Sequence, residues 1–154
     1  MNKMWWLVLP LVLLLGGPLQ AEQAVDIVKL QKGAAAGNAY DQLNLGAAYD
    51  NGIGVKRDVD KALQWYQKAA EQGLAEAQFN LAHLMVTEEI SSVAAAEWMR
   101  KAADQGMTDA EYLMGVIYME GIGLEMDPAE GRRWLKKAAA KGHAEAQKMF
   151  KELR

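Results

Sequence analysis

The sequence predicts an all-α fold, an α-solenoid of stacked helix pairs with a concave groove. The first observation behind this prediction is a set of four glycines at intervals of 36, 33 and 36 residues: Gly37, Gly73, Gly106 and Gly142. The second is the tripeptide Lys-Ala-Ala, which stands shortly before the last three of them, at 68–70, 101–103 and 137–139. A period of this length is typical of arrays in which each unit buries its faces against its neighbours.

Each unit is predicted to contain two helices. The first helix of the first unit covers about residues 39–49, where apolar and small side chains recur on one side at helical spacing. Gly52 and Gly54 end it, because glycine accepts the positive φ that a helix stop requires. The second helix begins near Asp58 and ends before Gly73.

The second helices carry capping residues at one end and a repeated tryptophan inside. Asp58, Ser91 and Asp127 are expected to be N-caps, and Pro128 suits a first helical position. Three tryptophans recur at one internal position and are predicted to be core residues: Trp65, Trp98 and Trp134. Small residues on the facing first helices would let the two helices of a pair approach closely: Gly46, Ala82 and Gly115.

Residues 1–21 are predicted to be a secretory signal peptide. The apolar run from Trp5 to Leu15 is shorter than the about 20 residues that a membrane-spanning helix needs. Gly16-Gly17-Pro18 then interrupts any helix, and cleavage is expected after Ala21. An uncleaved anchor is the alternative. The predicted location is the periplasm.

The rest of the chain, 22–154, is predicted to be a single repeat domain, large enough to bury a core without disulfides. Its predicted parts are a half-unit at 25–36, repeats at 37–72, 73–105 and 106–141, and a closing helix at 142–154.

The composition argues against several classes of function. A net charge of −3 does not favour charge-driven binding to nucleic acid. The chain has no cysteine and two histidines, so it offers few ligands for a metal and no thiol nucleophile. We expect no catalytic residue, no metal site, no cofactor and no small-molecule substrate. A weak hydrolase using Ser91 and His83 is a remote alternative.

The repeated residues resemble a known family. The pattern Ala-x-Ala-Gln-x-x-Leu-Gly-x-x-Tyr-x-x-Gly-x-Gly-Val, followed by a tryptophan and Lys-Ala-Ala, is similar to the Sel1-like repeat, a relative of the tetratricopeptide repeat. Residues 42–73 match it nearly throughout, and the resemblance covers about 30–154. Two departures are Asp41, where alanine is usual, and a middle unit that is three residues short and lacks Gly-x-Gly. The resemblance implies an adaptor that holds partner proteins.

The side of each first helix that faces away from the core is the predicted partner-binding surface. It would line the concave groove if the first helices form the inner curve. Its residues differ between units while the core positions repeat, as expected of a surface that a partner reads. The predicted partner-binding residues are Tyr40, Asn44, Asn51, Glu76, Asn80, His83, Thr87, Asp109, Leu113, Val116 and Glu120.

Charge is unevenly distributed along the chain. Eight cations and three acids give residues 128–154 a net charge of +5, and eight cations and seventeen acids give residues 22–127 a net charge of −9. The basic end is the one part of the chain expected to contact anionic lipid, although a solvated outer face is the favoured interpretation.

The sequence therefore predicts a non-enzymatic protein-interaction module, an adaptor or regulator of an envelope complex, whose partner is another protein. The alternative is an immunity protein that neutralises a toxin effector, such as a lipase-type effector, delivered to the periplasm.

Overall fold

The computed structural model describes residues 26–153, so the predicted signal peptide lies outside the described residues. In residues 26–153 all regular structure is helical. The helices are α1 (Ile27–Ala35), α2 (Ala39–Asn51), α3 (Val59–Glu71), α4 (Ala75–Thr87), α5 (Ser92–Asp104), α6 (Thr108–Glu120), α7 (Pro128–Ala140) and α8 (Ala144–Glu152).

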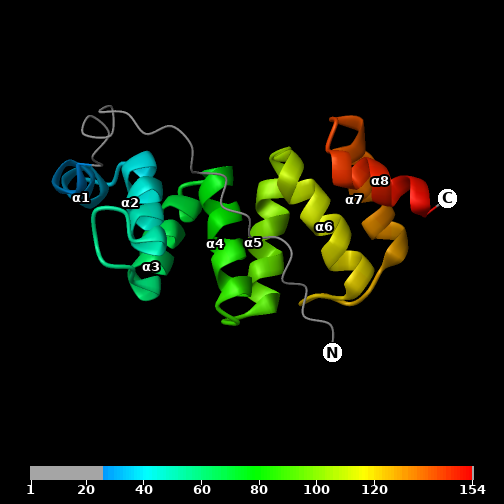
Figure 1. The fold of residues 1–154 in the computed structure, drawn as a ribbon, viewed down its shortest axis with the longest axis horizontal. Coiled ribbons are helices and arrows are strands. Elements are labelled where there is room, and N and C mark those ends of the chain that lie inside the picture. Colours follow the sequence, from blue (N-terminus) through cyan, green and yellow to red (C-terminus); the bar gives the residue numbers. More distant parts are fainter. Residues whose placement is uncertain (1–25, 154) are drawn as a thin grey trace, which may run out of the picture.

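The helices follow one another along the long axis of the molecule (Figure 1). The most extensive contacts join α2 to α3, α4 to α5 and α6 to α7, and each of these pairs packs on the next through the helices adjacent in sequence. This arrangement confirms the predicted α-solenoid of stacked helix pairs. No helix within 26–153 combines the length and apolar character needed to cross a membrane.

The predicted helix ends are confirmed. The side chains of Asp58 and Ser91 each accept a hydrogen bond from the backbone N–H three residues later, at the starts of α3 and α5. Asp127 caps α7, whose first residue is Pro128. Gly52 closes α2 with a φ of 68°. These local signals set the helix boundaries.

Glycines allow the two helices of a pair to touch. A Cβ atom on Gly46 would lie 2.6 Å from the ring of Tyr66, and one on Gly115 would lie 2.6 Å from Cγ of Leu135. Carbon atoms in contact lie about 3.5–4.0 Å apart, so no side chain fits at either glycine. Tyr66 and Leu135 are in turn fully buried where the helices meet.

The tryptophans are less central than predicted. Trp65 and Trp98 are half-buried, whereas Trp134 is buried. The deeply buried side chain is the next residue along each second helix: Tyr66, Met99 and Leu135. One residue turns the side chain by about 100° around the helix axis, which places Trp65 and Trp98 at the margin of the pair. At each of the three tryptophans the ammonium of the lysine three residues later lies 3.7–4.1 Å from the ring centroid.

A ladder of side-chain hydrogen bonds links successive repeats. Gln42 donates to the carbonyl of Ala34, eight residues earlier, at 3.1 Å, and accepts from Nε2 of Gln72 at 2.7 Å. Gln78 makes the same two kinds of bond, at 3.2 and 2.8 Å, and Gln147 repeats the donor bond in α8 at 3.1 Å. The ladder therefore ties α2 to the ends of α1 and α3, and α4 to the ends of α3 and α5.

The third repeat departs from this ladder, because Glu111 stands in place of the glutamine. Oε1 of Glu111 accepts from Nζ of Lys141 at 2.8 Å. Oε2 has no hydrogen-bond partner among the described residues, although Glu111 is only 4% exposed. A carboxylate cannot donate to the carbonyl eight residues earlier, that of Ala103, as an amide does. A buried polar atom without a partner costs about 1–3 kcal/mol.

The unusual Asp41 is accommodated by a second departure on the facing helix. Where the other repeats have the first alanine of Lys-Ala-Ala, α1 has Gly33. A Cβ atom on Gly33 would clash with the Asp41 carboxyl group, since it would lie 2.6 Å from Cγ. The larger side chain of Asp41 on α2 therefore occupies the space that the missing side chain of Gly33 leaves on α1.

Glu111→Gln is expected to raise the free energy of unfolding by about 1 kcal/mol, because the amide can donate to Ala103 and still accept from Lys141. Gln78→Glu is the matched control, and it should lower stability by removing the donor to the carbonyl of Ala70. Urea denaturation measures both changes. Wild-type stability in both variants would show that the ladder contributes nothing.

Gly33→Ala is expected to destabilise the protein by about 1–3 kcal/mol through overpacking against Asp41. Adding Asp41→Ala should restore at least wild-type stability, because it recreates the alanine pairing of the other repeats and removes a helical glycine. Thermal unfolding of both single variants and the double variant tests this coupling. A double variant no more stable than Gly33→Ala would contradict it.

Candidate partner-binding surface

The predicted partner-binding residues lie on one side of each first helix, α2, α4 and α6, at spacings of three and four residues. We call these eleven residues the first-helix surface. Eight of them are exposed: Tyr40, Asn44, Asn51, Glu76, His83, Thr87, Asp109 and Glu120. The side chains of this surface are therefore mostly available to a partner.

The other three residues of this surface are half-buried: Asn80, Leu113 and Val116. Leu113 packs against the core cluster that contains Met114 and Trp134. Part of the Leu113 side chain is therefore engaged in the packing around the core, and its role in partner binding stays a prediction. Mutational tests of this surface should use fully exposed positions instead.

Charge distinguishes the first helices from the second. The first helices contain six acidic residues and no lysine or arginine. The second helices, α3, α5 and α7, contain eight cations and five acids, a net charge of +3. Three residues of the first-helix surface are acidic, Glu76, Asp109 and Glu120, and none is lysine or arginine, so this surface carries negative charge.

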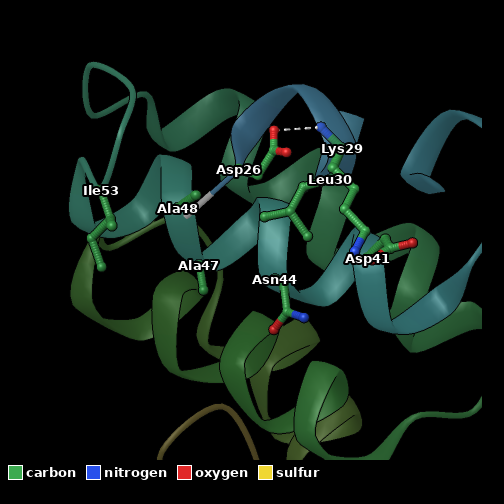
Figure 2. A pocket seen from close by; sticks show the side chains of 8 residues that line it. All are labelled: Asp26, Lys29, Leu30, Asp41, Asn44, Ala47, Ala48 and Ile53. Carbon is green, nitrogen blue, oxygen red and sulfur yellow. Dashed lines mark hydrogen bonds between the residues drawn. The ribbon is translucent and has the colours of Figure 1, made fainter. Parts of the chain in front are cut away.

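A hollow of about 480 Å³ adjoins the first-helix surface at the N-terminal end of the stack (Figure 2). Leu30 lines it from α1, Asp41 and Asn44 line it from α2, and Ile53 lines it from the turn after α2. The hollow joins the first-helix surface, through Asn44, to that turn. Its lining combines aliphatic groups with carboxylates, an amide and the ammonium of Lys29.

Ser91 and the two histidines, His83 and His143, lie in different parts of the stack, and two of the three cap helices. Ser91 caps α5, and Nδ1 of His143 accepts from the backbone N–H three residues later at 3.2 Å, at the start of α8. The His143 ring stacks on Tyr112, with centroids 4.3 Å apart. His83 is exposed and stacks on Phe79. Within 26–153 no three potential ligands are grouped closely enough to hold a metal ion.

An ion-pair cluster ties the first repeat to the second. Arg57, in the turn after α2, donates to Glu88 at 2.5 Å and lies 3.9 Å from Asp50. The hydrogen bond and the charge of Glu88 raise the pKa of Arg57. Asp50 also accepts from the hydroxyl of Tyr66 at 3.4 Å, and burial, with the charge of Asp50, raises the pKa of that phenol. The cluster holds the first turn against the end of α4.

The turns after the first helices contain features that the sequence reasoning missed. Glu89 has a φ of 53°, the one positive φ outside glycine in residues 26–153. It plays the part of Gly52 and Gly121, which close α2 and α6 with φ near 70°. The residue that follows each of them is an isoleucine, whose N–H bonds a carbonyl five residues earlier: Ile53, Ile90 and Ile122. The isoleucine that recurs in all three turns was a sequence signal for their common geometry. In the middle repeat it was overlooked because the glycines around it are missing.

Several cations of the basic C-terminal end make contacts within the molecule. Arg133 pairs with Glu130 at 2.8 Å, and Lys141 pairs with Glu111 at the same distance. Arg132 donates to a carbonyl beyond the end of α8 at 2.7 Å. Contact of this end with anionic lipid, and its interpretation as a solvated outer face, both stay predictions.

Comparisons with known proteins identify the repeat. The family model described as "Sel1 repeat" matches residues 39–74, 75–107 and 108–143. The chain is 33% identical over 128 residues to chitin synthase regulatory factor 3 of Schizosaccharomyces pombe, covering 79% of this chain and 14% of that protein. It is 42% identical over 62 residues to a sel1-like repeat-containing protein of Acanthamoeba polyphaga mimivirus, covering 40% and 11%. The chain thus spans a small part of both relatives.

Two solved structures are similar over most of this chain. A Sel1 repeat protein from Oxalobacter formigenes has a TM-score of 0.73 and 32% identity, covering 82% of this chain and 98% of that one. A protective antigen of uropathogenic Escherichia coli strains, which displays an SLR fold, has a TM-score of 0.75 and 35% identity, covering 80% and 27%. Sel1-repeat proteins mediate protein–protein interaction. With three matched repeats and the same fold, this chain belongs to the Sel1 repeat family.

Proposed function

We propose that this protein is exported to the periplasm, loses its signal peptide after Ala21, and acts there as a non-enzymatic adaptor or regulator of an envelope complex. It binds a partner protein through the first-helix surface. The apolar run from Trp5 to Leu15 supports export, and the absence of cysteine is compatible with it.

The observation that carries the proposal is the contrast between the buried and exposed positions of the first helices. One buried position keeps a large aliphatic side chain in every repeat: Leu45, Leu81 and Met114. An exposed position changes from an aromatic to an acidic residue: Tyr40, Glu76 and Asp109. The stack therefore presents a different polar pattern in each repeat on a scaffold that stays the same.

The relatives support a role in binding rather than in catalysis. One of them is named as a regulatory factor, and the family mediates protein–protein interaction. Because this chain spans 14% of that regulatory factor, what the two share is the repeat array. The function of that full-length protein therefore does not indicate which partner this chain binds.

An immunity role is a second version of the same binding function. An immunity protein would inhibit the toxin effector that it captures, such as a lipase-type effector, whereas an adaptor would leave its partner active. Capture from a periplasmic extract, followed by an activity assay of the identified partner, separates the two.

Asn44→Lys with His83→Lys is expected to weaken the captured partner at least about tenfold, because it places two cations on a negative, exposed surface. Calorimetry with the identified partner measures the change. Gln64→Lys with Gln67→Lys is the matched control, since it adds the same charge at exposed positions of α3. If both double variants keep their circular dichroism spectrum and bind the partner with equal affinity, the partner does not bind the first-helix surface.

Export is tested separately from binding. We expect intact-mass analysis of the protein from a periplasmic fraction to give an N-terminus at Glu22. A product that begins at Met1 and stays in the membrane fraction would contradict export as a cleaved protein.

A further inference from the structure

We propose that the turns after the first helices form a second binding surface, which takes a basic, amphipathic helical segment of a partner protein. We call this surface the loop edge, and it comprises the turns at 52–58 and 121–127 together with residues 86–93, which include the last two residues of α4 and the first two of α5. It adjoins the first-helix surface, with which it shares Thr87, and the proposal does not depend on where the protein is exported.

The three turns form one continuous edge. The ion pair between Arg57 and Glu88 joins the first turn to the end of α4. Gly123 lies so close to the backbone of Ser92 that a Cβ atom would clash with it, which places the third turn against the start of α5. Figure 1 shows the α4–α5 turn and the α6–α7 turn on the same, lower side of the stack. A partner segment can therefore lie across all three repeats.

Exposed apolar side chains concentrate on this edge. Among the described residues seven large apolar side chains are exposed, and five of them belong to the loop edge, at 46–62% exposure: Ile53, Val86, Ile90, Val93 and Met126. Single apolar residues scattered over a surface are ordinary, but a gathering along one edge indicates a contact surface. At the first turn Ile53 also lines the hollow between α1 and α2, which offers a socket for one apolar side chain.

The charges of the loop edge favour a basic partner. Glu89 and Glu125 make no side-chain hydrogen bond or ion pair within residues 26–153. Of the two cations in the three turns, Arg57 is already held by Glu88, which leaves Lys56. Free carboxylates beside an apolar strip match a helix with aliphatic side chains on one face and lysine or arginine beside them.

The backbone of Glu89 supports the proposal independently. Its left-handed conformation is one that glycine adopts without strain, and the other two turns have glycine there. Strained residues of this kind tend to be kept where the side chain has a use. The Glu89 carboxylate stands next to Ile90, where it would meet a cation of the bound segment.

The test uses two synthetic peptides of about 18 residues, long enough for five helical turns, and the purified protein. One peptide has leucines on one face and lysines on the other, and its counterpart has glutamate in place of every lysine. Fluorescence anisotropy should show binding of the lysine peptide at least about tenfold tighter than that of the glutamate peptide. Glu89→Lys with Glu125→Lys should weaken the lysine peptide at least about tenfold.

Two further variants separate the edge from general charge effects. Glu71→Lys with Asp104→Lys makes the same change of charge at the opposite ends of α3 and α5, and should leave the affinity unchanged. Glu89→Gly should raise the melting temperature by a few degrees, by relieving strain, and still weaken the lysine peptide.

Three results would overturn the proposal. The first is equal binding of the two peptides, and the second is wild-type affinity in the Glu89→Lys, Glu125→Lys protein. The third is self-association that the same variant abolishes, which would assign the edge to a second copy of the chain. If the peptide tests fail while the first-helix variants weaken the captured partner as expected, the loop-edge proposal is wrong and the proposed function is retained.

Discussion

The close approach of two helices at a small residue, glycine in the first and third pairs and Ala82 in the middle one, is the contact on which the rest of this structure depends. Gly46 and Gly115 have no side chain, so Tyr66 and Leu135 fill the space between the helices of a pair. A pair packed this tightly still has an open side, which the next pair covers, and the chain extends as a stack. The glutamine ladder then links one pair to the next, because Gln42 and Gln78 each bond to the helices on both sides of their own.

Much of the fold could be predicted from the sequence because its signals are local. The caps at Asp58, Ser91 and Asp127 and the stop at Gly52 depend on residues within one turn of a helix, and the period supplies the stacking. The position of the tryptophans could not be predicted in the same way. Each second helix packs against a first helix on either side, and the side chains that face both neighbours are the most buried. The sequence pattern does not distinguish those positions from the adjacent ones, which are rotated by about 100° around the helix axis.

The candidate surfaces were predictable only in part, for a related reason. Helical spacing located the exposed side of the first helices, and most of those residues are exposed. The same spacing could not show that Leu113 packs against the core of its own stack. The loop edge was hidden because Glu89 replaces a glycine, so the middle turn resembled a deletion although it closes its helix with the same backbone hydrogen bond. The sequence pattern also did not show that the missing side chain of Gly33 makes room for the carboxyl group of Asp41.

The central claim is that partners bind the side of the stack formed by the first helices and the turns that follow them. Amide hydrogen exchange of the protein alone and with its captured partner tests this claim most directly, because it reports every helix in one measurement. The account predicts slower exchange in α2, α4, α6 and the turns after them, with little change on α7 and α8. Protection confined to α7 and α8, with the first helices and their turns unchanged, would contradict it.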